Sequence, residues 1–428
     1  MATSTVAQPA IRVLPRRRRI VRAWLIMTIV FIRSLVASWF LIKTFLMKIN
    51  GAACLRERKY FSPMLPFFMM LKLKWLWWRG IWTATTEGHE PALEAKFMAY
   101  IPKVEDYVEA HYKPVTEEIP LPEYDWKNGN PKDFMEKFVK TPQPVVLRGF
   151  ALQSDAVKKW TFDYILEKCG EVEVNLTSAT EDWIGKLKEV RDPKIYCANA
   201  DAPFKACPEL TDDLGIPKLQ PYLNRRNTWN QFFIGQKSTG SGYHCAGIWN
   251  FFHMVEGKKK WVFVDPEYTW MLYPSMITSA MAYGSLVSFP WKADLSYYRM
   301  YKYCPRFWVD LEPGDVLLNP PWWWHAIDNL TPTSIAVATR WDAMGRDFSF
   351  YEINRILSIL ALFNPRFPRF LYRYLMTDVG KGRHIIQQGG GAFEEDDKVE
   401  VDRKNQKARD ENSYHGGIVR KVQLKRKW

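Results

Sequence analysis

Features that identify several common protein classes are missing from this sequence of 428 residues. Its six cysteines form no C-x-x-C pair, which argues against a zinc ribbon or a dithiol redox motif. Six is also a low number for a disulfide scaffold of this length. No internal repeat is visible, which argues against a repeat architecture. The chain is therefore expected to fold around an ordinary apolar core.

Net charge is also missing from most of the chain. The total is +14, but residues 1–80 hold fifteen Lys and Arg and one acid, Glu57, while the remainder carries 45 charges of each sign. A domain that binds nucleic acid concentrates positive charge on its own surface. We therefore expect no nucleic-acid partner. Apolar residues make up 47% and aromatic residues 15%, as in a globular protein with a well-buried core.

The basic leader, residues 1–95, contains a candidate membrane anchor. Sixteen of the twenty residues at 23–42 are apolar, enough to span a bilayer core as a helix. Arg33 costs roughly 2.5–3.5 kcal/mol at its centre, which a dozen apolar residues worth about 0.3–0.6 kcal/mol each can offset. The sequence thus predicts a single-pass protein of an organelle or endomembrane. The first 56 residues contain no acid, so a cleaved import presequence is the alternative, and a helix lying in the membrane interface is another.

A second aromatic segment, residues 61–82, differs from a spanning helix. It is interrupted by Pro63, Pro66, Lys72 and Lys74, and it ends in W-L-W-W-R-G-I-W. Tryptophans beside basic residues are typical of the membrane interface. This segment is predicted to lie on the membrane surface rather than to cross it.

Between the leader and residue 240, helix and strand signals alternate. Asn130 before Pro131 is a typical helix cap, and Gly149 and Gly170 end elements. The predicted helices are 95–111, 132–139 and 160–168, and the predicted strands are 144–149, 171–177 and 229–235. Residues 183–228 are proline-rich and are predicted to be irregular.

Residues 241–330 hold the candidate site. His244 and His325 stand near its two ends, and Lys259 follows the first histidine by fifteen residues. In a strand over 243–255, alternation places Ala246 and Asn250 on the face of His244, whereas Cys245 and His253 take the other face. His253 is therefore interpreted as a structural histidine.

Each of these residues also has a simpler interpretation. Lys259 belongs to three consecutive lysines beside a Gly turn, which are more often solvated, and a lone histidine is more often a core residue than a ligand. A buried lysine would need an anionic partner, because an unpaired buried ammonium is costly. Further strands are predicted at 258–264, 316–318 and 333–341, with a turn at Pro313-Gly314-Asp315.

These motifs, in this order, resemble the cupin-like, JmjC-type oxygenases that depend on iron(II) and 2-oxoglutarate. The resemblance is strongest to the branch of the asparaginyl hydroxylase that inhibits hypoxia-inducible factor, and it covers roughly residues 98–345. The matching residues are His244 of H-x-D, Asn250-Phe251-Phe252, the G-x-K of Gly257 to Lys259, Pro313-Gly314-Asp315, Trp323-Trp324-His325 and the P-V-V-L-R-G of residues 144–149.

The resemblance implies a mainly β (α+β) fold, a double-stranded β-helix of the cupin/JmjC jelly-roll type at 96–345 with flanking helices. It implies iron(II) held by His244 and His325, and 2-oxoglutarate bound by Lys259 with Asn250 and Ser241. The third metal ligand of the family, an Asp, falls on Ala246, and a methyl group cannot ligate a metal.

Three functions remain open at this point. The first is that of an inactive pseudo-oxygenase that serves as a binding or scaffold module. Alternatively, the domain is an oxygenase that hydroxylates a protein or small molecule, its site completed by water, Cys245 or a distant carboxylate. The third alternative is a halogenase-like site in which chloride fills the position left by the carboxylate. Residues 346–386 are predicted to be helical, either packed on the barrel or forming a homodimer, and residues 387–428 a flexible charged tail.

Overall fold

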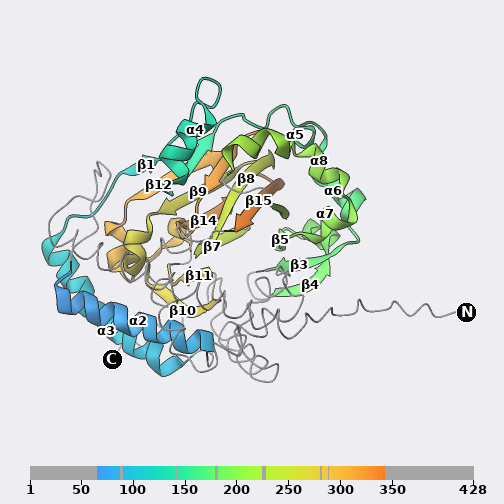
Figure 1. The fold of residues 1–428 in the computed structure, drawn as a ribbon. Helices are drawn as coiled ribbons and strands as arrows, with labels where there is room; N and C mark the ends of the chain where they lie inside the picture. Colours follow the sequence, from blue (N-terminus) through green and yellow to red (C-terminus); the bar gives the residue numbers. More distant parts are fainter. Residues whose placement is uncertain are drawn as a thin grey trace, which may run out of the picture.

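The computed structural model describes residues 65–86, 90–140, 142–178, 182–223, 228–279, 282–287 and 289–342. Two β-sheets lie at the centre, with helices on opposite sides (Figure 1). The apolar side chains between the sheets come from both of them, including Phe252 and Ala338 from one sheet and Trp261 and Phe263 from the other. This mainly β arrangement is that of a jelly roll, as predicted.

The first sheet has seven strands and contains both histidines of the candidate site. In spatial order its strands are β1 (Glu118–Pro120), β12 (Arg306–Leu311), β9 (Lys259–Val264), β14 (Trp324–Asn329), β7 (Gly240–Ala246), β11 (Ala282–Ser285) and β10 (Pro274–Ser279). Only the β1–β12 pair is parallel among the described strands of this sheet.

The second sheet has eight strands and faces the first. In spatial order they are β2 (Val145–Leu147), β13 (Val316–Asn319), β8 (Ile248–Glu256), β15 (Ser334–Asp342), β6 (Trp229–Gly235), β5 (Tyr196–Ala200), β3 (Glu173–Thr177) and β4 (Asp182–Lys186). Strand β6 matches its predicted range, and β2, β3, β9, β13 and β15 fall within or close to theirs.

Helices cover the outer faces of the sheets. The α-helices are α2 (Phe67–Thr86), α3 (Pro91–His111), α4 (Pro131–Phe134), α5 (Asp155–Lys159), α6 (Phe162–Cys169), α7 (Ala202–Ala206) and α8 (Glu209–Asp213). A π-helix, η1 (Met135–Val139), continues α4, and the 3-10 segments are η2 (Leu187–Arg191), η3 (Ile216–Tyr222), η4 (Pro266–Leu272), η5 (Pro290–Lys292) and η6 (Arg299–Tyr303). Asn130 caps α4 by accepting a hydrogen bond from the Asp133 N–H at 2.9 Å, as predicted.

Two predictions about the strands were wrong. The predicted single strand over 243–255 is two strands, β7 and β8, which belong to different sheets. Gly247 separates them beside the Trp322 ring, where an added Cβ would lie 2.4 Å from a ring carbon. The predicted irregular region 183–228 contains β4 and β5 as well as α7 and α8.

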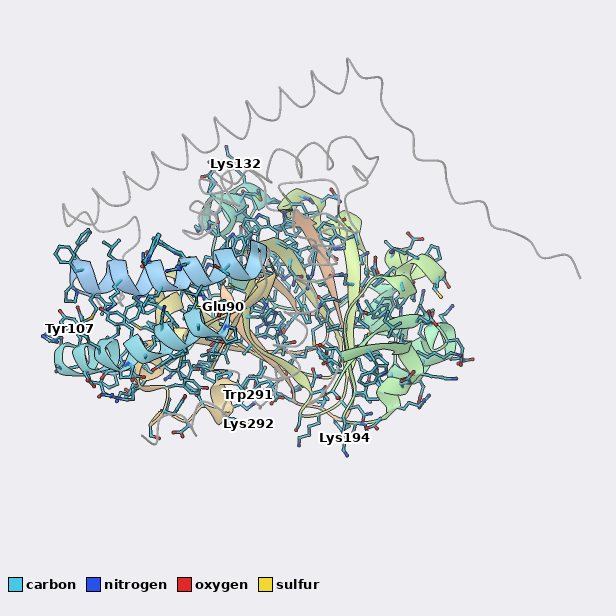
Figure 2. All side chains as sticks on the ribbon, turned by 90° about the horizontal axis from the view of Figure 1, so that it is seen from below. Glu90, Tyr107, Lys132, Lys194, Trp291 and Lys292 are labelled. Carbon is cyan, nitrogen blue, oxygen red and sulfur yellow. The ribbon has the colours of Figure 1, made fainter. Side chains whose placement is uncertain are left out.

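Helices α2 and α3 pack together at one end of the seven-stranded sheet (Figure 2). Figure 2 shows Glu90, the cap of α3, at one end of that helix and Tyr107 toward the other. Gly80 lets α2 approach β10 closely, since a Cβ there would overlap the Met276 side chain at 2.1 Å. The buried side of α2, with Leu73, Trp77 and Ile81, joins the core cluster that lies outside the barrel.

The predictions for the leader and for the C-terminal region are tested only where the structure describes residues. Within the described ranges, none of the helices combines the length and the apolarity needed to cross a membrane, and this includes α2. The candidate spanning segment 23–42, the predicted helices within 346–386 and the tail at 387–428 all lie outside the described residues. These remain predictions from the sequence.

The turn at Pro313-Gly314-Asp315 ties the two ends of the domain together. The Asp315 carboxylate accepts hydrogen bonds from the Gly149 N–H at 2.9 Å, the Arg148 Nη1 at 2.7 Å and the Glu312 N–H at 3.0 Å. Asp315 is buried, with 5% of its surface exposed. It therefore joins the residues after β2 to the turn before β13, the strand with which β2 pairs.

We predict that Asp315→Ala lowers the free energy of unfolding by about 2–4 kcal/mol, because it leaves buried donors without their acceptor. Urea denaturation of the purified protein measures this difference. Glu312→Ala is the matched control, because its ion pair with Lys258 is exposed, and we expect little change. Equal destabilisation by the two variants would show that Asp315 does not hold this junction.

Candidate functional site

The two histidines are brought together by the pairing of β7 with β14. His244 lies directly opposite His325, and their ring centroids are 4.2 Å apart. Each ring is oriented by its own strand: Nδ1 of His244 donates to the Gly242 carbonyl and Nδ1 of His325 to the Trp323 carbonyl, both at 2.8 Å. This leaves both Nε2 atoms as acceptors, the form in which imidazole ligates a metal. Nε2 of His325 lies 3.3 Å from the Asn319 Nδ2.

Both histidines are held in the neutral form. Burial lowers the pKa of His244, and the positive charge of Arg340 lowers it further. Burial likewise takes the pKa of His325 well below its usual range, with additional contributions from His244 and Arg340. The charge of the Arg340 guanidinium, which donates from Nη2 to the Asn199 Oδ1 at 2.8 Å, thus disfavours protonation of both rings.

Lys259 is completely buried, whereas its two neighbours are not. Its ammonium donates to the Asn329 Oδ1 and lies 5.4 Å from the centre of the Tyr196 ring. Burial lowers the pKa of Lys259 to about 7, although Asp328 acts in the opposite direction. The simpler interpretation of three solvated lysines thus fails for Lys259. An ammonium at this place is available for an anion that enters the barrel.

Ser241 also faces the barrel interior. Between His325 and Ile327 the β7–β14 register shifts, so that Ile327 pairs with Ser241. Directly paired residues of an antiparallel sheet share a face, and Ile327 belongs to the interior core. The bulge therefore places Ser241 between the levels of Lys259 and the histidine pair. The structure thus brings together four residues predicted for one site, Ser241, His244, Lys259 and His325.

Asn250, the fifth, lies across the barrel in a polar row on the second sheet. Asn319 of β13 pairs with Asn250 of β8, and Asn250 pairs with Arg340 of β15. The three side chains share one face, which also carries the interior residues Phe252 and Ala338. We call Asn319, Asn250 and Arg340 the polar row. It reaches the histidines through the contact of Asn319 with His325.

The residues present do not fit an iron(II) ion held by the protein in the usual way. Such a site needs two histidines and one carboxylate on one face of the metal. Ala246 follows His244 by two residues on β7 and supplies no donor, and no group of three His, Cys, Asp or Glu side chains suited to a metal occurs among the described residues. Cys245 is not a substitute, since its side chain lies in the core cluster outside the barrel. The site retains two well-oriented ligands and lacks the third.

His253 occupies a different environment from His244. It is buried, and its Nε2 lies 3.1 Å from the Thr339 Oγ1 on β15. Burial lowers the pKa of His253 to about 4, so this ring is neutral. The side chain packs between strands of the second sheet, as expected of a structural histidine.

Sequence reasoning missed two members of the site, Asn319 and Arg340. Asn319 stands just after the predicted strand 316–318, and Arg340 lies within the predicted strand 333–341. Alternation from the small interior residues Ala336 and Ala338 would have placed Arg340 on the inner face. A single arginine among small residues on the inner face of this strand was the signal that could have identified Arg340 as a member of the site.

A double-stranded β-helix with paired histidines on adjacent strands and a buried lysine on the next strand is typical of cupin-like barrels. Comparison with known families gives the same result: the model of the cupin-like domain matches residues 177–347. This domain is of the JmjC type, in the family of oxygenases that depend on iron(II) and 2-oxoglutarate.

Curated relatives share this domain at modest identity. "Lysine-specific demethylase JMJ21" of Arabidopsis thaliana is 25% identical over 240 residues, which are 49% of this chain and 25% of the relative. "Jumonji C domain-containing protein 5" of Drosophila melanogaster is 24% identical over 241 residues, 49% of this chain and 57% of the relative. "HSPB1-associated protein 1" of Rattus norvegicus is 32% identical over 133 residues, 30% of this chain and 26% of the relative. The chain thus spans between a quarter and just over half of each of these proteins.

We predict that Lys259→Met stabilises the protein near neutral pH. The folded-state pKa of about 7 lies below the unfolded value, so the unfolded chain binds the extra proton between pH 7 and about 10.4. The wild type therefore gains stability from this group as the pH rises through that window. The variant lacks this dependence and should exceed the wild type by about 2–4 kcal/mol at pH 7, the difference shrinking toward pH 10.

Urea denaturation at pH 7, 8, 9 and 10 measures this difference. Lys260→Met changes the next residue of the same strand, whose ammonium lies over the Trp308 ring, and should keep the wild-type pH dependence. Parallel stability curves for wild type and Lys259→Met would mean that the buried lysine carries no such penalty.

Proposed function

We propose that this protein is a binding module built on an oxygenase barrel: it takes up a small acid of the 2-oxoglutarate class but does not turn over as an iron oxygenase. The observation that carries the proposal is the donor set. Two oriented imidazoles face each other, while Ala246 supplies no carboxylate and no alternative third ligand lies among the described residues.

The charge of the site supports this proposal. A facial triad places one negative charge beside the metal, which helps to hold a divalent cation. Here that charge is replaced by a methyl group, and the guanidinium of Arg340 acts on both histidines. A positive charge close to two prospective ligands opposes binding of a metal cation, because like charges repel at short range.

The part of the site that binds an acid is nevertheless kept. Lys259 is buried without an ion pair among the described residues, and an ammonium in that position is costly unless an anion joins it. Ser241 offers a hydroxyl between the level of Lys259 and that of the histidines, and Asn250 offers an amide on the facing sheet at the level of the histidines. Lys259 and Ser241 together suit a carboxylate group at the level of Lys259.

The demethylase activities named for the Arabidopsis relatives belong to those proteins, and active oxygenation here would need a metal site of a different composition. One such alternative has an observation in its favour. The positive charge of Arg340 near both histidines suits an anion such as chloride at the position beside Ala246. That alternative requires turnover that depends on chloride.

Anaerobic titration of the protein with iron(II) and 2-oxoglutarate tests the proposal. We expect no charge-transfer absorption from a chelated co-substrate in the wild type, and no decarboxylation of 2-oxoglutarate in air. We expect both to appear in Ala246→Asp, because the carboxylate supplies the third ligand. A wild-type protein that matches Ala246→Asp in both measurements would refute the binding-module proposal. Wild-type turnover that requires chloride would favour the halogenase-like alternative.

We also propose that the protein attaches to a membrane, and α2 supports this at the level of its surface. Phe67, Phe68, Leu71 and Trp75 are exposed on this helix, Phe68 to 80% and Trp75 to 58%. The helix contains Lys72, Lys74 and Arg79 and no acidic residue. Exposed aromatic residues beside lysines and arginines are typical of helices that lie in the bilayer interface.

An anionic lipid surface is the occupant that this composition fits best. Each basic residue close to such a surface contributes about 1 kcal/mol, and the exposed rings can enter the headgroup region. The segment 23–42, which the sequence predicts to span a bilayer, would hold the chain at the same membrane. This supports a location on an organelle or endomembrane.

Hydroxyl-radical footprinting of the full chain with vesicles tests this attachment. Oxidation of Phe68 and Trp75 should fall several-fold with phosphatidylserine-containing vesicles and less with neutral phosphatidylcholine vesicles. Ile184 is the internal control, since it is 72% exposed on β4, the edge strand of the other sheet. Unchanged oxidation of Phe68 and Trp75 with anionic vesicles would rule out the proposed contact.

A further inference from the structure

Arg340 is the feature of the barrel that the family resemblance does not account for. It stands at the β15 end of the polar row, and Asn319, which contacts His325, stands at the other end. Its Nη2 donates to the Asn199 Oδ1 at 2.8 Å, and the guanidinium lies 5.5 Å from the centre of the Phe233 ring. Its Nε is buried and has no hydrogen-bond partner in the structure, and neither has the Oδ1 of Asn250 beside it.

The charges around Arg340 are not balanced by the protein. Among the described residues no carboxylate forms an ion pair with Arg340 or with Lys259, although other arginines, such as Arg148 and Arg299, have such partners. Burial lowers the pKa of Arg340 to about 10, which leaves it fully charged at neutral pH. Two interior cations and two neutral imidazoles thus face one another without an anion.

The two cations lie at different levels of the barrel. Lys259 pairs with Asn329, whereas Phe263 of the same strand pairs with His325. Four residues of a strand correspond to about 13 Å of backbone, of which the lysine side chain covers part. The backbone of Arg340 lies at the level of the histidines, through its pairing with Asn250 and that of Asn250 with Asn319. Its guanidinium reaches Asn199 and the Phe233 ring on the neighbouring strands, while Lys259 belongs to the far level. A ligand with an acid group at each end is the molecule that satisfies both.

We propose that Arg340 takes the place of the metal: the barrel binds a small dicarboxylate with one carboxylate on Lys259 and the other on Arg340, without a metal ion. This rests on the proposed function and names its ligand class. A guanidinium recognises a carboxylate by two parallel N–H bonds, which gives it a geometric match that a point charge lacks. Asn250 and Asn319 add amide groups beside the second carboxylate.

Calorimetric titration of the full-length protein in EDTA tests this assignment. The probes are 2-oxoglutarate, which has both carboxylates, and 2-oxobutanoate, which keeps only the carboxylate beside the keto group. We expect 2-oxoglutarate to bind without metal and 2-oxobutanoate to bind at least tenfold more weakly. Arg340→Gln should weaken 2-oxoglutarate binding at least tenfold, and Arg340→Lys should restore part of the loss because it returns the charge.

Arg306→Gln is the matched control, since Arg306 lies on β12 with its guanidinium over the Tyr301 ring and donates to the Val115 carbonyl. It should leave the affinity unchanged. Thermal unfolding of each variant checks that the fold is kept, and Arg340→Lys carries the test if Arg340→Gln does not fold. Binding that requires a divalent cation, or an affinity of Arg340→Gln within twofold of the wild type, would overturn the assignment.

Failure of this inference can be told apart from failure of the proposed function. Turnover of 2-oxoglutarate with iron(II) contradicts the proposed function and is read in the decarboxylation assay. The role of Arg340 is read from affinity in EDTA, where no iron chemistry takes place. If the wild type and Arg340→Gln bind 2-oxoglutarate equally well in EDTA, the proposed function as a binding module stands. The proposed role of Arg340 is then excluded.

Discussion

The pairing of β7 with β14 is the constraint on which the site depends. It places His244 opposite His325, although the described chain between them forms six further strands and crosses repeatedly between the two sheets. Strand β14 also pairs with β9, so the same strand fixes the level of Lys259 relative to the histidines. The strand pairings therefore set the relative positions of these three residues. An alanine at position 246 leaves that arrangement intact.

The balance of charge inside the barrel determines which ligand the paired histidines can serve. Imidazoles oriented by the carbonyls of Gly242 and Trp323 would serve a metal well. The same imidazoles, neutral and with both Nε2 atoms as acceptors, cannot donate a hydrogen bond to a carboxylate, so an acid at this level would depend on Arg340 and the amide groups of the polar row. Ala246 removes a negative charge from this space and Arg340 adds a positive one. Both differences act in the same direction, toward anions and away from cations.

Much of the fold could be predicted because the signals were local. The cap at Asn130, the glycines at 149 and 170, and the β-rich segments at 229–235 and 333–341 depend on neighbouring residues. The break at Gly247 could not be predicted in this way, because the reason for it is the Trp322 ring, which arrives from a distant segment. Strands β4 and β5 were missed since the prolines around them suggested irregular chain.

The candidate site likewise contains residues that could be predicted from the sequence and residues that could not. His244, Lys259 and His325 are found from spacing and family motifs, whereas the burial of Lys259 beside exposed lysines follows only from the register of β9. Arg340 carries no motif, and its importance appears when β15 is placed across the barrel from β14. Alternation along β15 can place Arg340 on the inner face, but only the arrangement of the two sheets shows which residues it lies opposite.

The pairing of β1 with β12 and of β2 with β13 has a consequence for how the chain folds. Residues 145–147 find their partners at 316–318, and residues 118–120 find theirs at 306–308. Contacts so distant in sequence close slowly, because the loop entropy is lost before the contacts form. During synthesis, the first two strands must therefore wait for nearly the whole domain to emerge. A fragment limited to residues 177–347 would lack both strands and expose the edges of β12 and β13, which makes it prone to aggregation.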